Sequence, residues 1–242
     1  MSIRLWFTSG LLLLCSCGVA SGQSSEYDAQ PADSLWSEMT VSMAEVEEKI
    51  THAINIINNF INSGVSSDIK QQAQAIVIIP RLFRVSFIMG GKTGAGLLLF
   101  RLPDGTWSSP LFVLLSGGSL GLQLGASSSD VLLLFRSAAD LDVLENGKVT
   151  LTAIAAVAVG NFGKASVAAT DIRFKADIYA WLRQRGLFLG VALEGALLDL
   201  DMPTMQAFYA PNEINFNALR YGTLIHTHSL VGELRELLKG WE

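Results

Sequence analysis

The feature that most constrains the fold is a long run of short apolar segments between Ala75 and Leu200, joined by connections typical of turns. Runs of four to eight residues bounded by Gly, Pro, Asn and Asp are typical of β-strands. Pro103-Asp104-Gly105 predicts one such turn, because proline presets φ and glycine tolerates a positive φ. We predict strands at Ala75 to Ile79, Phe83 to Met89, Gly96 to Leu102, Ser109 to Leu115, Leu120 to Ala126, Val131 to Arg136, Val149 to Val159, Ala165 to Arg183 and Leu187 to Leu200.

Helical periodicity flanks this region on both sides. Apolar residues recur every three or four positions from Trp36 to Ser63, which predicts an amphipathic helix packed on a sheet. A short helix follows the capping residues Ser66-Ser67-Asp68, and another interrupts the strands. The other expected helices are Ala138 to Glu145, Pro203 to Tyr209, Glu213 to Arg220 and Ser229 to Lys239. The fold class is therefore α+β, with a predominantly antiparallel, strongly curved sheet, barrel-like at its extreme.

Glycine is unusually frequent inside the predicted strands. It weakens strand pairing, so its cost must be offset by a conformational use. Bulges, tight bends and the close approach of another backbone, or of an acyl chain, are such uses. The glycines concerned are Gly90, Gly91, Gly94, Gly96, Gly117, Gly118, Gly121 and Gly125.

The amino terminus predicts export. Residues 1–16 carry one charge and an apolar run too short to span a bilayer as a helix, which is typical of a signal peptide. Leu14-Cys15-Ser16-Cys17 has the form of a lipobox, so we expect Cys17 to be acylated and to begin the mature chain. Cleavage after Gly22 is the alternative. Residues 17–34 resemble a flexible tether, and residues 35–242 are expected to form one domain.

Residue inventory excludes several classes of site. The only cysteines are Cys15 and Cys17, so the predicted domain has no disulfide and no thiolate nucleophile. A net charge of −5 argues against nucleic acid as a partner. Gly91-Lys92-Thr93 lacks the upstream glycine of a phosphate-binding loop. With three histidines and no third ligand suggested by spacing, we expect no metal, no cofactor and no catalytic residues.

One predicted strand carries a candidate binding surface. Alternation between Ala165 and Arg183 places Tyr179, Trp181 and Arg183 on one face, with Arg185 at the following turn. Aromatic rings beside cations are favoured at a lipid headgroup layer, and Lys92 is a further candidate contact. The alternative is a cross-strand pair that covers neighbouring strands.

The following strand contains one carboxylate, Glu194, between Ala192 and Ala196. An unpaired buried charge is too costly to keep, so Glu194 is either paired with an arginine or available to a ligand.

Several motifs resemble the SYLF domain family. They are Ala75 to Pro80, the segment "GGKTGAGLLLFR", its continuation "WSSPLFVLLSGGSLGLQLGASSSDVLLLF", and Gly186 to Ala196, "GLFLGVALEGA". The resemblance covers roughly Ile69 to Tyr209 and implies a single globular domain that binds membrane lipids. Eukaryotic members of the family bind phosphoinositides and actin, and bacterial members are mostly exported. The family's basic lipid-binding helix corresponds here to the acidic stretch Met43 to Ile61, which argues against phosphoinositide binding by that route.

Together these features predict an exported, membrane-anchored, non-enzymatic lipid-binding protein. The expected partners are membrane phospholipid and a second envelope protein, and actin is not expected for an exported bacterial chain. Gly18 after the cysteine favours the outer membrane facing the periplasm, with a secreted or soluble periplasmic protein as the alternative. A structural or protein-interaction module of the envelope without a lipid ligand is the alternative function.

Overall fold

A curved sheet of eight strands, in the order β5-β8-β3-β2-β1-β4-β7-β6, organises the chain from Val41 onward. The structure is a computed structural model and describes residues 41–62, 67–86, 89–120, 125–151, 157–161, 178–185 and 196–241. Among these residues the pairings are antiparallel except that between β6 and β7. This confirms the predicted α+β fold class.

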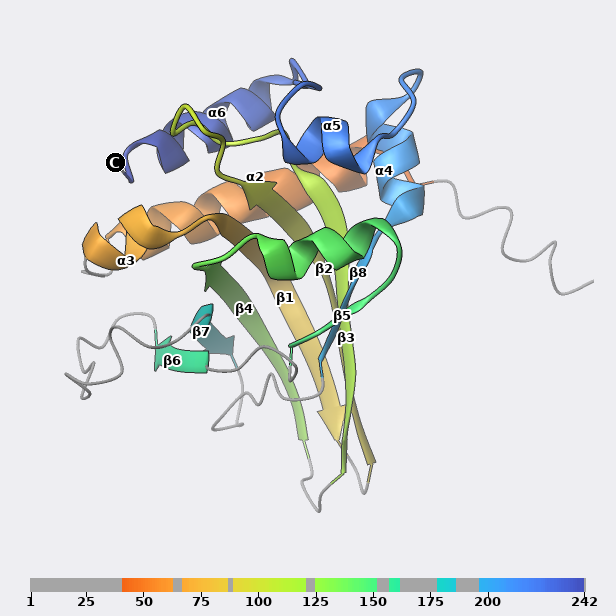
Figure 1. Ribbon diagram of the computed structural model, residues 1–242. Helices are drawn as coiled ribbons and strands as arrows, with labels where there is room; N and C mark the ends of the chain where they lie inside the picture. The colour runs from red at the N-terminus through yellow and green to blue at the C-terminus, as the bar shows by residue number, and fades with distance from the viewer. Residues whose placement is uncertain are drawn as a thin grey trace, which may run out of the picture. The chain divides into compact units, whose positions relative to one another are not determined.

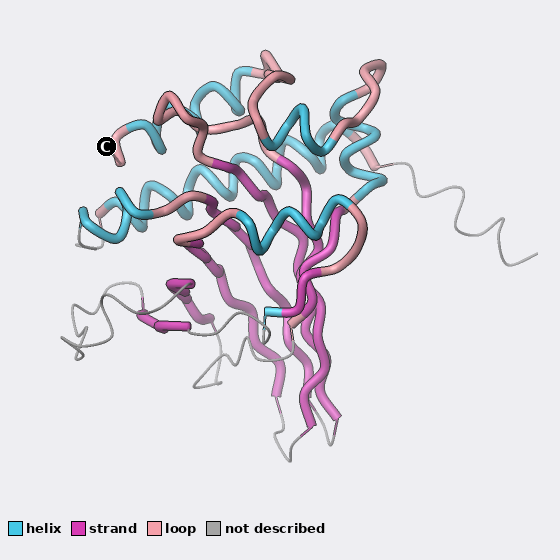
Figure 2. Tube along the Cα trace, viewed as in Figure 1, coloured by secondary structure: helices cyan, strands magenta, loops and turns pink. Residues whose placement is uncertain are grey.

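The strands are β1 (Ala75–Ser86), β2 (Met89–Phe100), β3 (Leu111–Leu120), β4 (Gly125–Phe135), β5 (Val149–Thr150), β6 (Val157–Asn161), β7 (Ile178–Arg185) and β8 (Leu197–Leu200). The helices are α2 (Met43–Ile61), α3 (Ser67–Gln72), the 3-10 helix η1 (Ala139–Glu145), α4 (Met202–Tyr209), α5 (Phe216–Arg220) and α6 (Ser229–Lys239). Figure 1 labels all of these except η1, the green helix that follows β4, and Figure 2 shows the long strands of the sheet extending past the helices.

The expected helices are present, and three strand predictions need correction. Val149 to Val159 is not one strand, because β5 ends at Thr150 and pairs with β8, whereas β6 begins at Val157 and pairs with β7. Phe83 to Met89 is not a separate strand, because β1 runs through Pro80 to Ser86. Leu120 to Ala126 is not one strand either, since β3 ends at Leu120 and β4 begins at Gly125. Signal peptide, tether and most of the strand predicted from Ala165 lie outside the described residues.

A bulge explains how β1 continues through proline. The pairing of β1 with β2 shifts register between Ile78 and Phe83, and Arg81 adopts φ 54°. The Arg81 backbone N–H donates to the side-chain carboxylate of Asp130 on β4 at 3.2 Å, instead of to a backbone carbonyl of a neighbouring strand. Opposite the bulge, a Cβ on Gly96 would overlap the Ile78 carbonyl oxygen. The expectation that strand glycines permit bulges and close backbone approach is confirmed here.

Helix α2 covers one face of the sheet. Ser42 and Glu45 form a capping box at its start, and Val46, Ile50, Ile57 and Phe60 are buried along one stripe. The ring centroid of Phe60 lies 5.0 Å from that of Trp181 in β7, and Phe208 of α4 lies 5.1 Å from Phe112 in β3. We call this side of the sheet the α2 face.

The opposite side, which we call the α5 face, is covered by α5 and η1. Ala75 pairs with both Phe100 and Phe135, so these three side chains share a face. Phe100 contacts Phe216 of α5, with ring centroids 6.1 Å apart. Both faces of the central strands are therefore buried, and Figure 1 shows η1 crossing in front of them.

Candidate functional site: the surface between η1 and α5

The aromatic rings of the predicted aromatic and cationic surface are not exposed. Tyr179 and Trp181 do share a face of β7, as predicted, but they are only 3% and 7% exposed. Their face is the α2 face, and Trp181 packs edge-on against Phe60 of α2. The prediction that these rings meet a lipid headgroup layer is wrong, because a helix already occupies the position assigned to lipid. The alternative, rings that cover neighbouring strands, fits better.

The remaining predicted residues do not gather into one site. Lys92 is buried at 4% exposure, which contradicts its expected role as a surface contact. Arg183 is exposed beside Asp130 in the β4–β7 register, and the Arg185 backbone pairs with Ser128. The side chain of Arg185 is not described, and both Cys17 and Glu194 lie outside the described residues.

The surface with the clearest features of a binding site lies where η1 meets α5. In a 3-10 helix, side chains three residues apart lie on the same side. Accordingly Leu141 and Leu144 are buried, whereas Val143 is 57% exposed. Asp142 and Glu145 form a third row, which faces α5. Each row of η1 thus has a distinct environment.

Two polar contacts fix α5 against η1. The Arg220 Nε donates to an Asp142 carboxylate oxygen at 2.9 Å, and the Asn217 side-chain amide donates to Glu145 at 2.7 Å. The Arg220 guanidinium also lies 4.3 Å from the centroid of the Phe100 ring, and its side chain is only 14% exposed. Because the guanidinium is held by a carboxylate and a ring, this junction is rigid.

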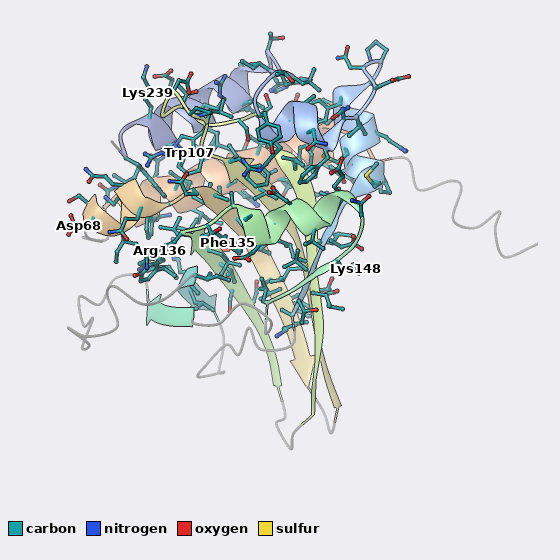
Figure 3. The ribbon with its side chains drawn as sticks, in the orientation of Figure 1. Asp68, Trp107, Phe135, Arg136, Lys148 and Lys239 are labelled. Atoms are coloured by element: carbon teal, nitrogen blue, oxygen red, sulfur yellow. The ribbon has the colours of Figure 1, made fainter. Side chains whose placement is uncertain are left out.

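Tyr221 follows α5 and completes the surface. It is 58% exposed, and the Arg220 guanidinium lies 5.2 Å from its ring centroid. We call the group Asp140, Asp142, Val143, Glu145, Arg220 and Tyr221 the η1–α5 patch. It joins two exposed apolar side chains to an ion pair whose arginine side chain is mostly buried, a composition that favours protein recognition. Figure 3 shows Arg136 and Lys148, which bracket η1 in the sequence, on opposite sides of it.

Sequence reasoning missed this patch, although one signal was present. Val143 breaks the three-residue spacing of Leu141 and Leu144, and an apolar residue out of phase with the core marks an exposed contact. Tyr221 lies in a turn and carries no comparable signal.

The described part of the chain contains no cluster of three metal-ligating side chains. Within the same residues, no helix has both the length and the apolar character needed to span a membrane. Several charged groups of the described residues are engaged in pairs, such as Lys49 with Asp201 at 3.5 Å and Arg81 with Glu48 at 2.6 Å.

Comparison with known proteins identifies relatives in eukaryotes. Residues 116–239 match the Ysc84 family, described as "Las17-binding protein actin regulator". The chain is 30% identical over 168 residues to SH3 domain-containing YSC84-like protein 1 of Xenopus laevis, which covers 69% of this chain and 50% of that protein. It is 29% identical over 151 residues to LAS seventeen-binding protein 3 of Saccharomyces cerevisiae (strain S288c), covering 61% and 33%. The chain thus spans half or less of the length of these relatives.

These names correct the expected partners. We expected membrane phospholipid and no role for actin, but the matching family is described as an actin regulator, and a relative is named for binding a protein. The names of the family and its relatives denote binding and regulatory proteins. The resemblance to the SYLF family is confirmed, since the matched residues make up just over half of the sequence and include all of the η1–α5 patch. The chain belongs to the Ysc84 family, the family of the SYLF domain.

Proposed function

We propose that this chain is a non-catalytic protein-binding module that takes part in actin regulation, and that its partner docks on the η1–α5 patch. The proposal rests chiefly on one observation, the exposure of Val143 and Tyr221 on either side of the Asp142–Arg220 ion pair. Exposed aromatic and aliphatic side chains around a fixed guanidinium are typical of the residues that dominate protein interfaces.

The part of the chain that matches the family supports the same surface. The match to the family described as a Las17-binding actin regulator includes η1 and α5 but begins after α2, β1 and β2. A binding property that this chain shares with the family is therefore expected to depend on the segment from β3 to α6. Within that segment Val143 and Tyr221 are the most exposed large apolar side chains of the described residues.

The test measures binding of the full chain to two probes. Co-sedimentation with filamentous actin and pull-down by immobilised Las17 are compared for the wild type, Val143→Ser and Tyr221→Ser. We expect one probe to bind the wild type and each substitution to weaken that binding about tenfold, because central apolar contacts contribute more than about 1.4 kcal/mol each.

The matched control is Ile225→Ser, which removes an apolar side chain that is 49% exposed outside the patch. Far-ultraviolet circular dichroism establishes that each variant is folded. Failure of both probes to bind would refute the actin-regulatory proposal. Binding that survives both patch substitutions while Ile225→Ser abolishes it would refute the assignment to the η1–α5 patch.

A further inference from the structure

We infer that the η1–α5 patch takes a protein segment in which basic residues flank an apolar side chain. This inference rests on the proposed function, since it names the chemistry of the partner at the same surface. It follows from three properties of the patch: its charge, the arrangement of that charge around Val143, and the fixed junction between η1 and α5.

The patch has an excess of negative charge. It contains three carboxylates, from Asp140, Asp142 and Glu145, and a single guanidinium, from Arg220, which gives a formal charge of −2. The guanidinium is 14% exposed and donates to Asp142, so it is not presented to a partner. Asp140 and Glu145 are both exposed.

One of the two neighbouring cations is paired outside the patch. Lys148 follows η1, but its ammonium lies 3.0 Å from an Asp199 carboxylate oxygen on β8. Arg136 precedes η1, and Figure 3 shows it away from Lys148, on the other side of η1. A partner segment that carries lysine or arginine is therefore complementary in charge, and an acidic segment is repelled.

The geometry places the apolar contact among the carboxylates. Asp140 and Val143 are three residues apart and lie on the same side of η1. Asp142 and Glu145 lie on the adjacent side, where α5 leads to Tyr221. An apolar side chain that contacts Val143 would thus have Asp140 on the same side of η1 and Asp142 and Glu145 on the adjacent side. This pattern selects a segment with basic residues on either side of its apolar residue.

The rigidity of the site favours binding of a flexible segment. Arg220 is held by Asp142 and by the Phe100 ring, and Asn217 is held by Glu145. Since the patch is ordered before binding, its own conformational entropy changes little when the partner docks. The partner alone loses conformational freedom.

The inference is tested with short fluorescent peptides and the full chain. One peptide has a central leucine flanked by lysines, a second replaces the lysines by glutamates, and a third replaces the leucine by serine. We expect the lysine peptide to bind more tightly than each of the others by about tenfold or more, measured by fluorescence anisotropy at low salt. Raising the salt concentration should weaken that binding, because the flanking contacts are exposed.

Variants locate the binding. Asp140→Lys combined with Glu145→Lys should weaken the lysine peptide about tenfold and favour the glutamate peptide. Glu233→Lys combined with Glu236→Lys makes the same charge change on α6, at two exposed side chains, and should leave both affinities close to wild type. Equal binding of the lysine and glutamate peptides would overturn the inference, as would no binding of the lysine peptide up to about 1 mM.

The outcome is separable from that of the proposed function. If Tyr221→Ser abolishes binding to filamentous actin or Las17 while the peptides show no charge preference, the η1–α5 patch binds protein but the chemistry inferred here is wrong. If the lysine peptide binds the patch and neither protein probe binds, the inferred chemistry stands and the actin-regulatory proposal fails.

Discussion

Replacing Gly96 by alanine tests whether close packing at the β1 bulge holds the central strands together. A Cβ built on Gly96 would overlap the Ile78 carbonyl oxygen and lie 2.6 Å from Ile79 Cδ1 and 3.0 Å from the Ile78 carbonyl carbon. The Ile79 side chain can rotate away, but the Ile78 backbone belongs to β1 and is paired on both sides. The strand must therefore shift.

The magnitude follows from two opposing effects. Alanine in a strand interior is normally favoured over glycine by about 0.5–1 kcal/mol, because glycine loses more backbone entropy on folding. Overpacking against a rigid core costs about 1–3 kcal/mol. We expect Gly96→Ala to lower the free energy of unfolding by about 1–2 kcal/mol, which lowers the Tm by about 2–8 °C for a domain of this size.

The control lies on the same strand. A Cβ on Gly91 meets nothing within 4 Å, so Gly91→Ala should leave stability unchanged or raise it slightly. Thermal and urea unfolding followed by circular dichroism measure both variants. If Gly96→Ala is as stable as Gly91→Ala, the close approach of β1 and β2 is not a constraint, and the reasoning fails.

Four further predictions concern other parts of the chain. Arg81→Val should cost about 1–2 kcal/mol in chemical denaturation, since a β-branched side chain disfavours φ 54°, whereas Arg81→Gly should cost little, because the ion pair that is lost is exposed. Burial holds the pKa of His226 below its ordinary 6.5, so unfolding takes up a proton as the pH falls. Unfolding free energy should thus be highest above about pH 6.5 and decline below it, and His226→Gln should flatten that decline. Arg220→Ala should cost about 1–2 kcal/mol in urea unfolding, because it removes a mostly buried guanidinium from the Phe100 ring and its hydrogen bond to Asp142, and an unchanged midpoint would contradict this. Mass spectrometry of the native protein should find an acylated Cys17 at the mature terminus, and a chain beginning at residue 23 would disprove it.

Much of the fold could be predicted because local signals agree with the tertiary structure. The spacing of apolar residues predicted α2 and α6, and Ser42 with Glu45 provides the capping box at the start of α2. The bulge in β1 could not be predicted to the residue. Pro80 was interpreted as the end of a strand, since proline lacks the N–H that strand pairing uses. The structure accommodates it because Arg81 turns to φ 54° and donates its own N–H to Asp130.

The η1–α5 patch was beyond prediction for a different reason. Its two exposed apolar residues, Val143 and Tyr221, are 78 positions apart, the same spacing as the Asp142–Arg220 pair that joins them. A local pattern can indicate that η1 has an unusual outward valine. It cannot indicate which later segment lies beside it.

The error over Tyr179 and Trp181 shows what strand alternation can and cannot decide. Alternation assigns residues to two faces, and it did place both rings on one face of β7. It predicts a solvent-exposed face only where the sheet is covered by other elements on a single face. Here β7 pairs with β4, where Val131 to Phe135 are apolar without interruption and at most 1% exposed. A continuous apolar strand is buried on both sides, so its neighbour has no solvent face at those positions. The strand that pairs with β7 lies some 50 residues earlier in the chain. Only knowledge of that pairing shows that the two aromatic rings belong to the core and not to an exposed surface.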